Sequence, residues 1–397
     1  MRLIRTLERR PREFASSGHS LDVRLLALEF SRVAGDPSRV TAISRRMVAL
    51  AGMFALLLIV VVGPDAVRAE TVGYTGTIAF LRWPAGSTDY SSGPSLYVIR
   101  ADGSGLRRLT PAGTSVLSYA WSPDGETIAY TDTRLSLWLV QVDGIGRRLL
   151  LPTSRLSTVA LSWSPNGTTV AIVSPGPKAN FRHAWCTKLT LYVVPIDRSP
   201  VTPLRAGVGC DVAWSPRGDE IAYTASGPNR SGTWAIHPDG SGDRRIASVG
   251  GGKWSADGAR LSFGIAIHPR PDTVDRYRAF AVVNADGTNY HVVTTHAYNE
   301  YGEAWSPHGH QILYGRADHK GVYLIGSDGR NNHRVTRDSP PQAGWGALAW
   351  SPTGGSIAYT TGNFSNTDLY LIGIDGRGKT HLTNTPDIDI APSWVAR

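Results

Sequence analysis

A five-residue motif, Trp-Ser-Pro-x-Gly, recurs along most of this 397-residue chain and constrains its fold more than any other feature. The copies begin at Trp121, Trp163, Trp214, Trp305 and Trp350, with a WSADG variant at Trp254 and a truncated copy at Trp394. From Trp121 to Trp350, successive copies lie 40 to 51 residues apart, and apolar, strand-forming segments fill the intervals. A period of this length with strand-like content predicts a radial or solenoidal repeat fold.

Each copy of the motif predicts a β-hairpin. Proline presets the first corner of a turn, and glycine accepts the positive φ that a tight hairpin loop requires. An apolar strand such as ETIAY follows at once, so the tryptophan ends one strand and this segment forms its antiparallel partner. A second hairpin follows in each unit around an Asp-Gly turn, for example at 101–105 and 374–378. One unit is therefore expected to contain four antiparallel strands.

The number of strand sets predicts the number of blades. Each strand type occurs seven times, at about 47 residues per unit, which indicates an all-β, seven-bladed β-propeller of four-stranded antiparallel blades. The chain enters on a second strand (77–80) and leaves on a first strand (393–395), so the C-terminal strand should complete the first blade. This closure removes the open sheet edges that invite aggregation. Six blades is the alternative, if one weak unit is a loop.

The repeat also carries a family resemblance. The pattern WSPDG-x-x-IAY, with a Leu-Tyr-Val strand and an Asp-Gly turn, resembles the WD40-like PD40 repeat of TolB-like propellers. The resemblance covers roughly residues 74–397 and implies a protein-binding or scaffolding module of the cell envelope. Similar blades also occur in serine peptidases and in a few lyases. The propeller of TolB itself has six blades and follows an α/β domain, whereas here the first predicted strand follows an apolar segment almost directly.

The N-terminal region predicts export. Residues 47–63 form an uncharged apolar run of 17, preceded by Arg45 and Arg46 and followed by small residues at Ala69. We expect either a signal peptide or an N-terminal membrane anchor over 47–69, the latter tethering the protein to a membrane through 47–63. The predicted location is therefore extracytoplasmic: secreted, periplasmic or in the cell envelope. Residues 1–46 form a basic leader that is either disordered or upstream of the true start.

The net charge of +9 does not indicate nucleic-acid binding. Residues 1–46 hold ten arginines against five acidic residues, so the leader accounts for more than half of the excess. The propeller region contains neither a block of Lys and Arg nor a nucleic-acid reader motif. We therefore expect no nucleic acid as a partner; the partner that the resemblance implies is an envelope protein.

Both cysteines fall in the third repeat unit. Cys186 lies in a long loop, and Cys210 lies shortly before Trp214 in the connection to the next unit. Loops of these two kinds meet on one rim of a propeller. Because an even cysteine pair in an exported protein indicates a disulfide, we predict a Cys186–Cys210 bridge, with two buried thiols as the alternative.

The rim that carries the short turns is expected to be structural. Its aspartates resemble fragments of calcium loops, but none reaches the full ligand pattern, and each suits its own turn. These residues are Asp102, Asp124, Asp143, Asp239, Asp286, Asp328 and Asp375. The sequence holds no G-x-S-x-G elbow, no H-E-x-x-H motif and no Cys/His metal spacing, so it assigns no catalytic residue, metal ligand or cofactor.

The opposite rim holds the long, irregular loops at 81–94, 174–190, 264–278, 294–303 and 336–347, and binding residues usually lie on such loops. Aromatic side chains there are suited to anchor a partner, because they bury much area at little cost in rotamer entropy. For any one of them, packing at a blade end is the alternative. The candidates are Trp83, Tyr90, His183, Trp185, His268, Tyr277, His296, Tyr298, Tyr301 and Trp345, beside Phe181.

A secreted carbohydrate-active enzyme, a lyase or a hydrolase, is the alternative function. Its site would lie near the propeller axis, where imidazoles and carboxylates that converge could act as acid–base groups or bind a metal. The residues available for such a site are His183, His268, His296, Glu300, Glu303, Asp387 and Asp389. Sequence alone does not bring them together, so the interpretation that we favour is a protein without enzymatic activity.

Overall fold

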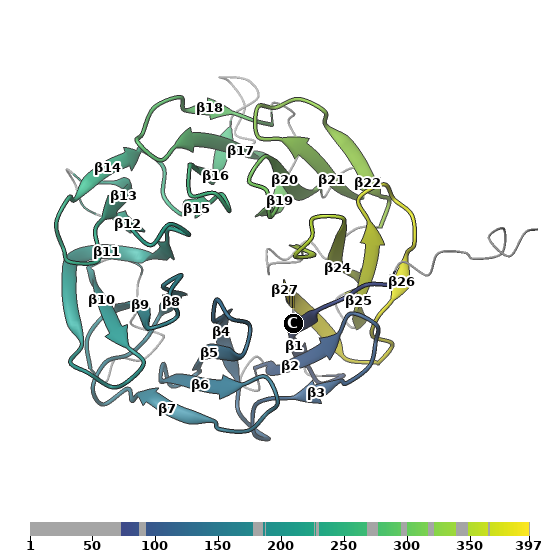
Figure 1. Ribbon diagram of the computed structural model, residues 1–397, viewed down its shortest axis with the longest axis horizontal. Coiled ribbons are helices and arrows are strands. Elements are labelled where there is room, and N and C mark those ends of the chain that lie inside the picture. The colour runs from purple at the N-terminus through teal and green to yellow at the C-terminus, as the bar shows by residue number, and fades with distance from the viewer. Residues whose placement is uncertain are drawn as a thin grey trace, which may run out of the picture. The chain divides into compact units, whose positions relative to one another are not determined.

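The computed structural model divides the chain into two compact units, Met1–Thr71 and Val72–Arg397, and every described residue belongs to the second. These residues form 27 strands and no helix, arranged radially as in a β-propeller (Figure 1). None of them belongs to a helix able to span a membrane; the apolar run 47–63 lies outside the described residues. The structure describes residues 73–86, 93–177, 186, 188–225, 227, 230–267, 277–294, 300–316, 321–338, 348–363 and 366–396.

The repeated motif forms the predicted hairpin with one constant register. Each tryptophan pairs across the hairpin with the first apolar residue of the next strand. The pairs are Trp121 with Ile128, Trp163 with Val170, Trp214 with Ile221, Trp254 with Leu261, Trp305 with Ile312, Trp350 with Ile357 and Trp394 with Ile78. Because successive side chains of a strand alternate between faces, this register fixes which residues of every hairpin enter the core.

Hydrogen bonds within the motif turn explain why it contains serine and an acidic or amide residue. In the first copy, the Ser122 hydroxyl donates to the Thr127 carbonyl and accepts from the Thr127 amide. The Asp124 carboxylate accepts the Glu126 amide at 2.9 Å and lies 2.5 Å from the Ser122 hydroxyl. Asn166 and Asp257 make the same contacts in their copies. The acidic or amide residue thus closes its own turn.

The repeat tryptophans join neighbouring hairpins. Their indole N–H groups donate to the backbone carbonyl of the residue that precedes the tryptophan of the adjacent unit. The bonds are Trp121 to Ser393, Trp163 to Ala120, Trp254 to Ala213, Trp305 to Lys253 and Trp350 to Ala304, at 3.0 to 3.3 Å. These tryptophans therefore pack between neighbouring strand sets. Trp214 and Trp394 depart from the pattern and donate to Gly218 and Thr75.

Three sheets are four-stranded and follow chain order. The first comprises β4 (Val116–Trp121), β5 (Thr127–Asp132), β6 (Leu137–Gln141) and β7 (Arg148–Leu151). The second comprises β15 (Lys253–Trp254), β16 (Arg260–Ile267), β17 (Tyr277–Asn284) and β18 (His291–Val292). The third comprises β19 (Glu300–Trp305), β20 (Gln311–Arg316), β21 (Gly321–Gly326) and β22 (His333–Thr336).

A seven-stranded sheet arises because one long strand serves two hairpin sets. β11 (Thr202–Trp214) pairs with β10 through its first half and with β12 through its second half. The register shifts between Val208 and Val212, where the strand passes from one set to the next. The other strands are β8 (Ala160–Trp163), β9 (Thr169–Ser174), β10 (Leu189–Pro195), β12 (Ile221–Ala225), β13 (Gly232–Ile236) and β14 (Arg244–Ala247).

The remaining sheet holds both ends of the described chain. Its strands are β23 (Leu348–Trp350), β24 (Ser356–Asn363), β25 (Asn366–Gly373), β26 (Thr380–His381), β27 (Ile388–Val395), β1 (Thr77–Trp83), β2 (Ser95–Arg100) and β3 (Arg107–Arg108). The C-terminal strand β27 pairs antiparallel with β1, as the sequence predicts. An added Cβ at Gly76, where φ is +97°, would lie 2.2 Å from the Val395 carbonyl oxygen, so this close approach requires glycine.

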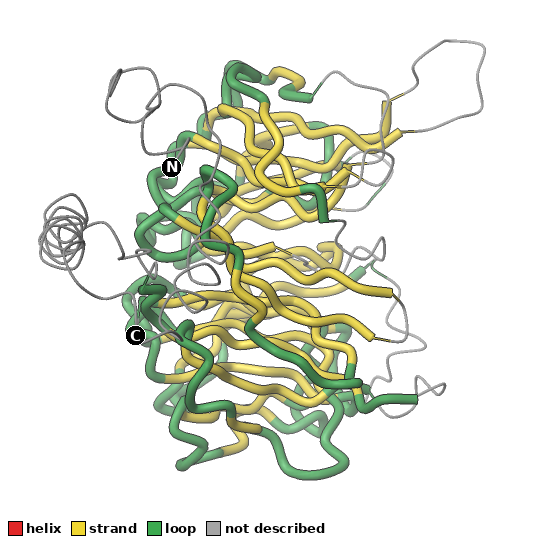
Figure 2. Tube along the Cα trace, turned by 90° about the vertical axis from the view of Figure 1, so that its right-hand side faces the viewer, coloured by secondary structure: helices red, strands yellow, loops and turns green. Residues whose placement is uncertain are grey.

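The hydrophobic core lies between neighbouring strand sets. One cluster joins Ile78 and Phe80 of β1 to Leu369 and Leu371 of β25. Strand β27 contributes Trp394 to this cluster and Ile390 to the next one. The motif turns and the Asp-Gly turns lie at one end of the strands, which we call the turn face; the connections at the other end form the loop face (Figure 2).

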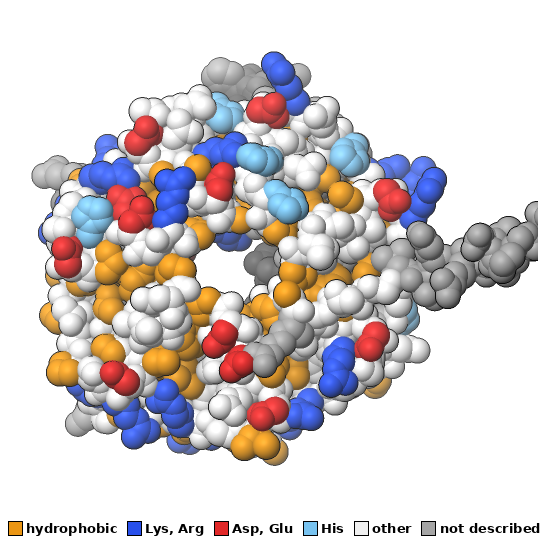
Figure 3. Space-filling view, viewed as in Figure 1, with side chains coloured by type: hydrophobic (Ala, Val, Ile, Leu, Met, Phe, Trp, Pro, Cys, Tyr) orange, Lys and Arg blue, Asp and Glu red, His pale blue; other side chains and the backbone are white. Residues whose placement is uncertain are grey.

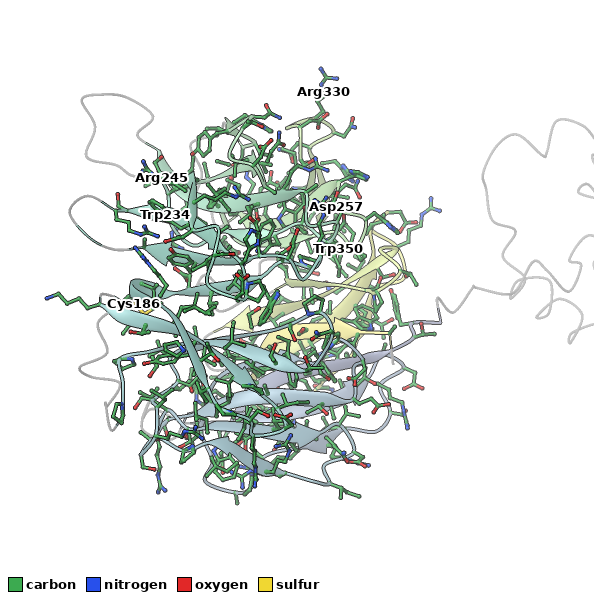
Figure 4. All side chains as sticks on the ribbon, turned by 60° about the vertical axis from the view of Figure 1, so that its left-hand side comes forward. Cys186, Trp234, Arg245, Asp257, Arg330 and Trp350 are labelled. Carbon is green, nitrogen blue, oxygen red and sulfur yellow. A yellow bond between two sulfur atoms is a disulfide. The ribbon has the colours of Figure 1, made fainter. Side chains whose placement is uncertain are left out.

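The predicted disulfide is present: Cys186 and Cys210 are bonded, with their Cα atoms 4.8 Å apart (Figure 4). Cys210 lies within the continuous strand β11 and not in a loop, which differs from the expectation. The bond therefore ties the segment that precedes β10 to the strand that links two hairpin sets.

Replacing both cysteines with serine is expected to lower the free energy of unfolding by about 3 kcal/mol, because the bond closes a loop with a sequence separation of 24 residues. Chemical denaturation of the oxidised wild type and of the double variant measures the difference. Reductant should bring the wild type to the stability of the variant and leave the variant unchanged. Equal denaturation midpoints would contradict a stabilising role.

Candidate functional site

The structure places only part of the predicted aromatic rim. Trp83 is the last residue of β1 and packs, partly buried, against a core cluster. Tyr277 is the first residue of β17. The other candidates lie outside the described residues, so a role for them on the loop face stays a prediction. These are Tyr90, Phe181, His183, Trp185, His268, His296, Tyr298 and Trp345.

The expectation that Tyr301 is an exposed loop residue is wrong. Tyr301 lies in β19 and is only 6% exposed, and burial raises the pKa of its hydroxyl to about 12. Its ring packs against Gly315, the residue paired with Tyr301 on the neighbouring strand. A Cβ added to Gly315 would lie 2.6 Å from the ring. The predicted loop ends at residue 303, but β19 already begins at Glu300. Tyr301 is therefore a strand residue, and its ring packs inward.

The acidic residues suggested for an axial enzyme site have structural contacts. Asp389 is fully buried and accepts two hydrogen bonds from the Arg82 guanidinium, at 2.6 and 2.7 Å. Asp387 accepts the Ala85 amide, and the Glu303 carbonyl accepts a hydrogen bond from Lys253. Glu300 is buried opposite Arg316 in the β19–β20 register. Across the described ranges, no group of three His, Cys, Asp or Glu side chains is placed to hold a metal ion.

A polar cavity opens on the turn face, with a volume of about 650 Å³. Three repeat units contribute to it: the turn before β12, strands β16 to β18, and the turn after β21. Over this part of the turn face, histidine, basic and acidic side chains lie close together (Figure 3). The cavity is lined by Arg217, Ala259, Arg260, Asn284, Ala285, Asp286, Asn289, His291, Ser327 and Asp328.

Arg260 forms the fixed wall of this cavity. Its Nη1 donates to the Ser327 hydroxyl at 2.6 Å, and its Nη2 donates to the Gly309 carbonyl at 3.0 Å. Nη2 also lies 3.1 Å from Nδ1 of His310. Because arginine only donates hydrogen bonds, this contact assigns Nδ1 of His310 as the acceptor and Nε2 as the protonated nitrogen.

His291 forms a second fixed side of the cavity. Its Nδ1 lies 2.9 Å from the Asn289 carbonyl oxygen, and its Nε2 lies 2.9 Å from the Ser327 carbonyl oxygen. The ring therefore bridges β18 to the turn after β21, and together with Arg260 it holds two adjacent strand sets in a defined geometry.

Arg217 is the exposed cation of the cavity. Its Nε donates to the Asp257 carbonyl at 2.9 Å. The side chain occupies the variable position of its Trp-Ser-Pro-x-Gly turn, which elsewhere is acidic, amide, threonine or histidine. A single such bond orients the guanidinium and leaves its two terminal nitrogens available as donors toward the cavity.

The cavity also carries negative charge. Hydrogen bonds from the hydroxyl and the amide of Thr288 lower the pKa of Asp286, so this carboxylate is ionised at neutral pH. Asp328 accepts the Arg330 amide through one carboxylate oxygen, and its other oxygen lies 4.0 Å from Nε of Arg330, whose exposed side chain projects toward solvent (Figure 4). The cavity therefore presents arginine and aspartate side chains together.

Two exposed apolar residues precede and follow His291 in the chain. Tyr290 is 46% exposed and Val292 is 40% exposed. They are two of the five large hydrophobic residues that are exposed within the described part of the chain. Both belong to the edge of their sheet, because β18 pairs only with β17.

Comparison with known proteins shows to which family the chain belongs. The sequence profile described as "TolB beta propeller domain" (PD40) matches residues 71–348. The chain belongs to the PD40 family. A Tol-Pal system protein TolB of Anaeromyxobacter dehalogenans (strain 2CP-C) is 31% identical to it over 111 residues. This match covers 28% of the present chain and 25% of the relative, so the PD40 protein described here spans about a quarter of that relative.

Solved structures show the same propeller fold. TolB from Acinetobacter baumannii superposes with a TM-score of 0.50 at 17% identity, covering 81% of this chain and 67% of the other. An oligogalacturonate lyase from Vibrio parahaemolyticus superposes with a TM-score of 0.56 at 13% identity, covering 71% and 84%. At these identities, the similarities establish the PD40 chain as a propeller and carry no information about its activity.

The cavity itself was not predicted from the sequence, which had assigned the whole turn face to structural turns. Its residues come from three separate units and meet only through packing between units. One sequence signal was available: Arg217 breaks the pattern of small or acidic residues at the variable turn position.

Proposed function

We propose that this PD40 propeller is an extracytoplasmic protein-binding module of the cell envelope, without enzymatic activity of its own. The observation that carries the proposal is the turn face, where a ligand-sized cavity carries both charge signs and the chain neighbours of its His291, Tyr290 and Val292, are exposed. Tyrosine and arginine are the residues that most often dominate protein interfaces. A rigid propeller presents them with little loss of conformational entropy on binding.

Two features support the proposed location. The disulfide is typical of oxidising compartments, and residues 47–69 are expected to direct export, with 47–63 as a membrane tether if the segment is retained. The curated relative is named as part of a Tol-Pal system. A partner related to that system is consistent with the proposal, although the match spans only a quarter of the relative.

We also propose that the propeller has seven blades. The support is the register of the repeat: seven tryptophans, including Trp394 of the closing strand, each pair with the first apolar residue of a following strand. If the two halves of the long strand β11 are assigned to two successive blades, each of the seven tryptophans belongs to a four-stranded blade.

The carbohydrate-active alternative has no support from the described residues. Its acidic candidates Asp387 and Asp389 contact Arg82 or the backbone, and its three histidines lie outside the described residues. It therefore stays a prediction from the sequence.

Capture of a partner from native envelopes tests the proposed function. The full chain would be immobilised, the retained proteins identified by mass spectrometry, and the leading candidate purified and titrated against the chain. Saturable one-to-one binding by the purified candidate is expected. If no purified candidate binds, and turnover of acidic oligosaccharides is found instead, the proposal is wrong.

A further inference from the structure

We propose that the turn-face cavity receives an extended peptide segment of the partner, and that Arg217 binds an acidic side chain of this segment. The inference rests on the proposed function and names the chemistry that the partner must present. The occupant is a segment in which an acidic residue lies close to a basic one, next to an apolar residue.

The acidic residue is required by Arg217. Arginine is suited to bind a carboxylate through two parallel N–H donors, and its planar fork fixes the direction of approach. The bond from Nε to the Asp257 carbonyl holds the guanidinium at the cavity, and the terminal nitrogens have no partner recorded among the described residues. Arg260 lies in the same cavity and adds positive potential, and three of its five N–H donors already bond Ser327, Gly309 and His310.

The basic residue is required by the two aspartates. Asp286 and Asp328 line the same cavity, and Asp286 is held ionised by its turn. A run of acidic residues alone would place a carboxylate near these groups, and like charges brought together cost binding free energy. A segment with adjacent charges of opposite sign satisfies Arg217 and the aspartates at once.

The apolar residue is indicated by the exposed residues next to His291 in the chain. Tyr290 and Val292 precede and follow His291, whose ring lines the cavity, and both are exposed. A partner side chain that covers them would bury apolar area beside the charged contacts, the usual arrangement of an interface core and rim.

A peptide fits this cavity better than a sugar. The volume of about 650 Å³ lies within the range of sites that enclose small ligands or short segments. The lining residues include no Trp, Tyr or Phe, the side chains on which a pyranose usually stacks. The charged groups instead match the side chains of a mixed-charge peptide.

Selection from a random linear peptide library displayed on phage tests the inference, with the full chain as bait. Selections on the wild type should enrich peptides that carry Asp or Glu close to Lys or Arg. Arg217→Gln should weaken binding of an enriched synthetic peptide roughly tenfold, the loss of about 1.4 kcal/mol that a strong interface arginine contributes. Arg217→Glu should reverse the preference, so that basic residues replace the acidic ones.

Arg155→Gln is the matched control, because Arg155 is an exposed arginine in the connection before β8, on the loop face. It should leave peptide binding unchanged. Enrichment without acidic residues, an absence of enrichment, or equal binding by the wild type and Arg217→Gln would overturn the inference. If a purified partner still binds Arg217→Gln with full affinity, the inference fails while the proposed function stands.

Discussion

Removal of residues 388–397 is expected to abolish cooperative folding of the propeller. Strand β27 lies in this segment and pairs with β1 along its length. Its Trp394 and Ile390 each enter a different core cluster, so the deletion opens the cores on both sides of β1. It also exposes the edge of β1, and an unpaired apolar edge strand promotes association between chains.

Thermal unfolding followed by circular dichroism, together with size-exclusion chromatography, measures this effect. The wild type should give one cooperative transition and a monodisperse peak, whereas the truncated chain should lack the transition and aggregate. Deletion of Ala396 and Arg397 alone is the control and should preserve both properties, because these residues follow β27. A cooperative transition in the longer truncation would show that the ring does not need its C-terminal strand.

The variant Asp389→Ala is expected to lose about 3 kcal/mol of unfolding free energy, because it removes the hydrogen-bonded counter-ion of a buried arginine and leaves only Asp387, 3.7 Å from Nε of Arg82, beside it. Asp389 is 0% exposed and Arg82 is 7% exposed, and two hydrogen bonds join them. Burial raises the pKa of the Asp389 carboxyl, while the bonds from Arg82 act in the opposite direction. The Arg82 guanidinium also lies over the Phe80 and Tyr97 rings, which offer no replacement for the lost carboxylate.

Urea denaturation of three proteins tests this explanation. Asp389→Ala should be the least stable, and the double variant Arg82→Met, Asp389→Leu should recover much of the loss, because no buried charge is left unpaired. Asp219→Asn changes an exposed aspartate on the turn face and should match the wild type. If the double variant is no more stable than Asp389→Ala, lost packing and not an unpaired charge explains the loss.

Sequence predicted most of the fold because the repeat acts locally. A turn of Ser-Pro-Asp-Gly is closed by its own side chains, and the tryptophan before it pairs with a residue only seven positions ahead, as Trp121 does with Ile128. The disulfide was also predictable, since two cysteines leave one pairing. The long strand β11 was not predictable. Only a shift in register distinguishes this continuous strand from the loop that was expected there.

The candidate site could not be predicted in the same way. Arg217, Arg260 and Ser327 come from three repeat units, and only the packing of these units brings them into one cavity. Tyr301 was misassigned because the burial of its ring depends on the missing side chain of Gly315, a contact across strands that composition does not reveal. In both cases the deciding contacts are non-local.

Site-specific photo-cross-linking in living cells tests the central claim most directly. A photoreactive residue at Tyr290 of the full chain, beside the cavity, should give a discrete adduct with one envelope protein, and Arg217→Glu should abolish that adduct. The same residue at Arg155, on the loop face, should give none. Adducts from Arg155 but not from Tyr290, or none from either position, would contradict a partner-binding role for the turn face.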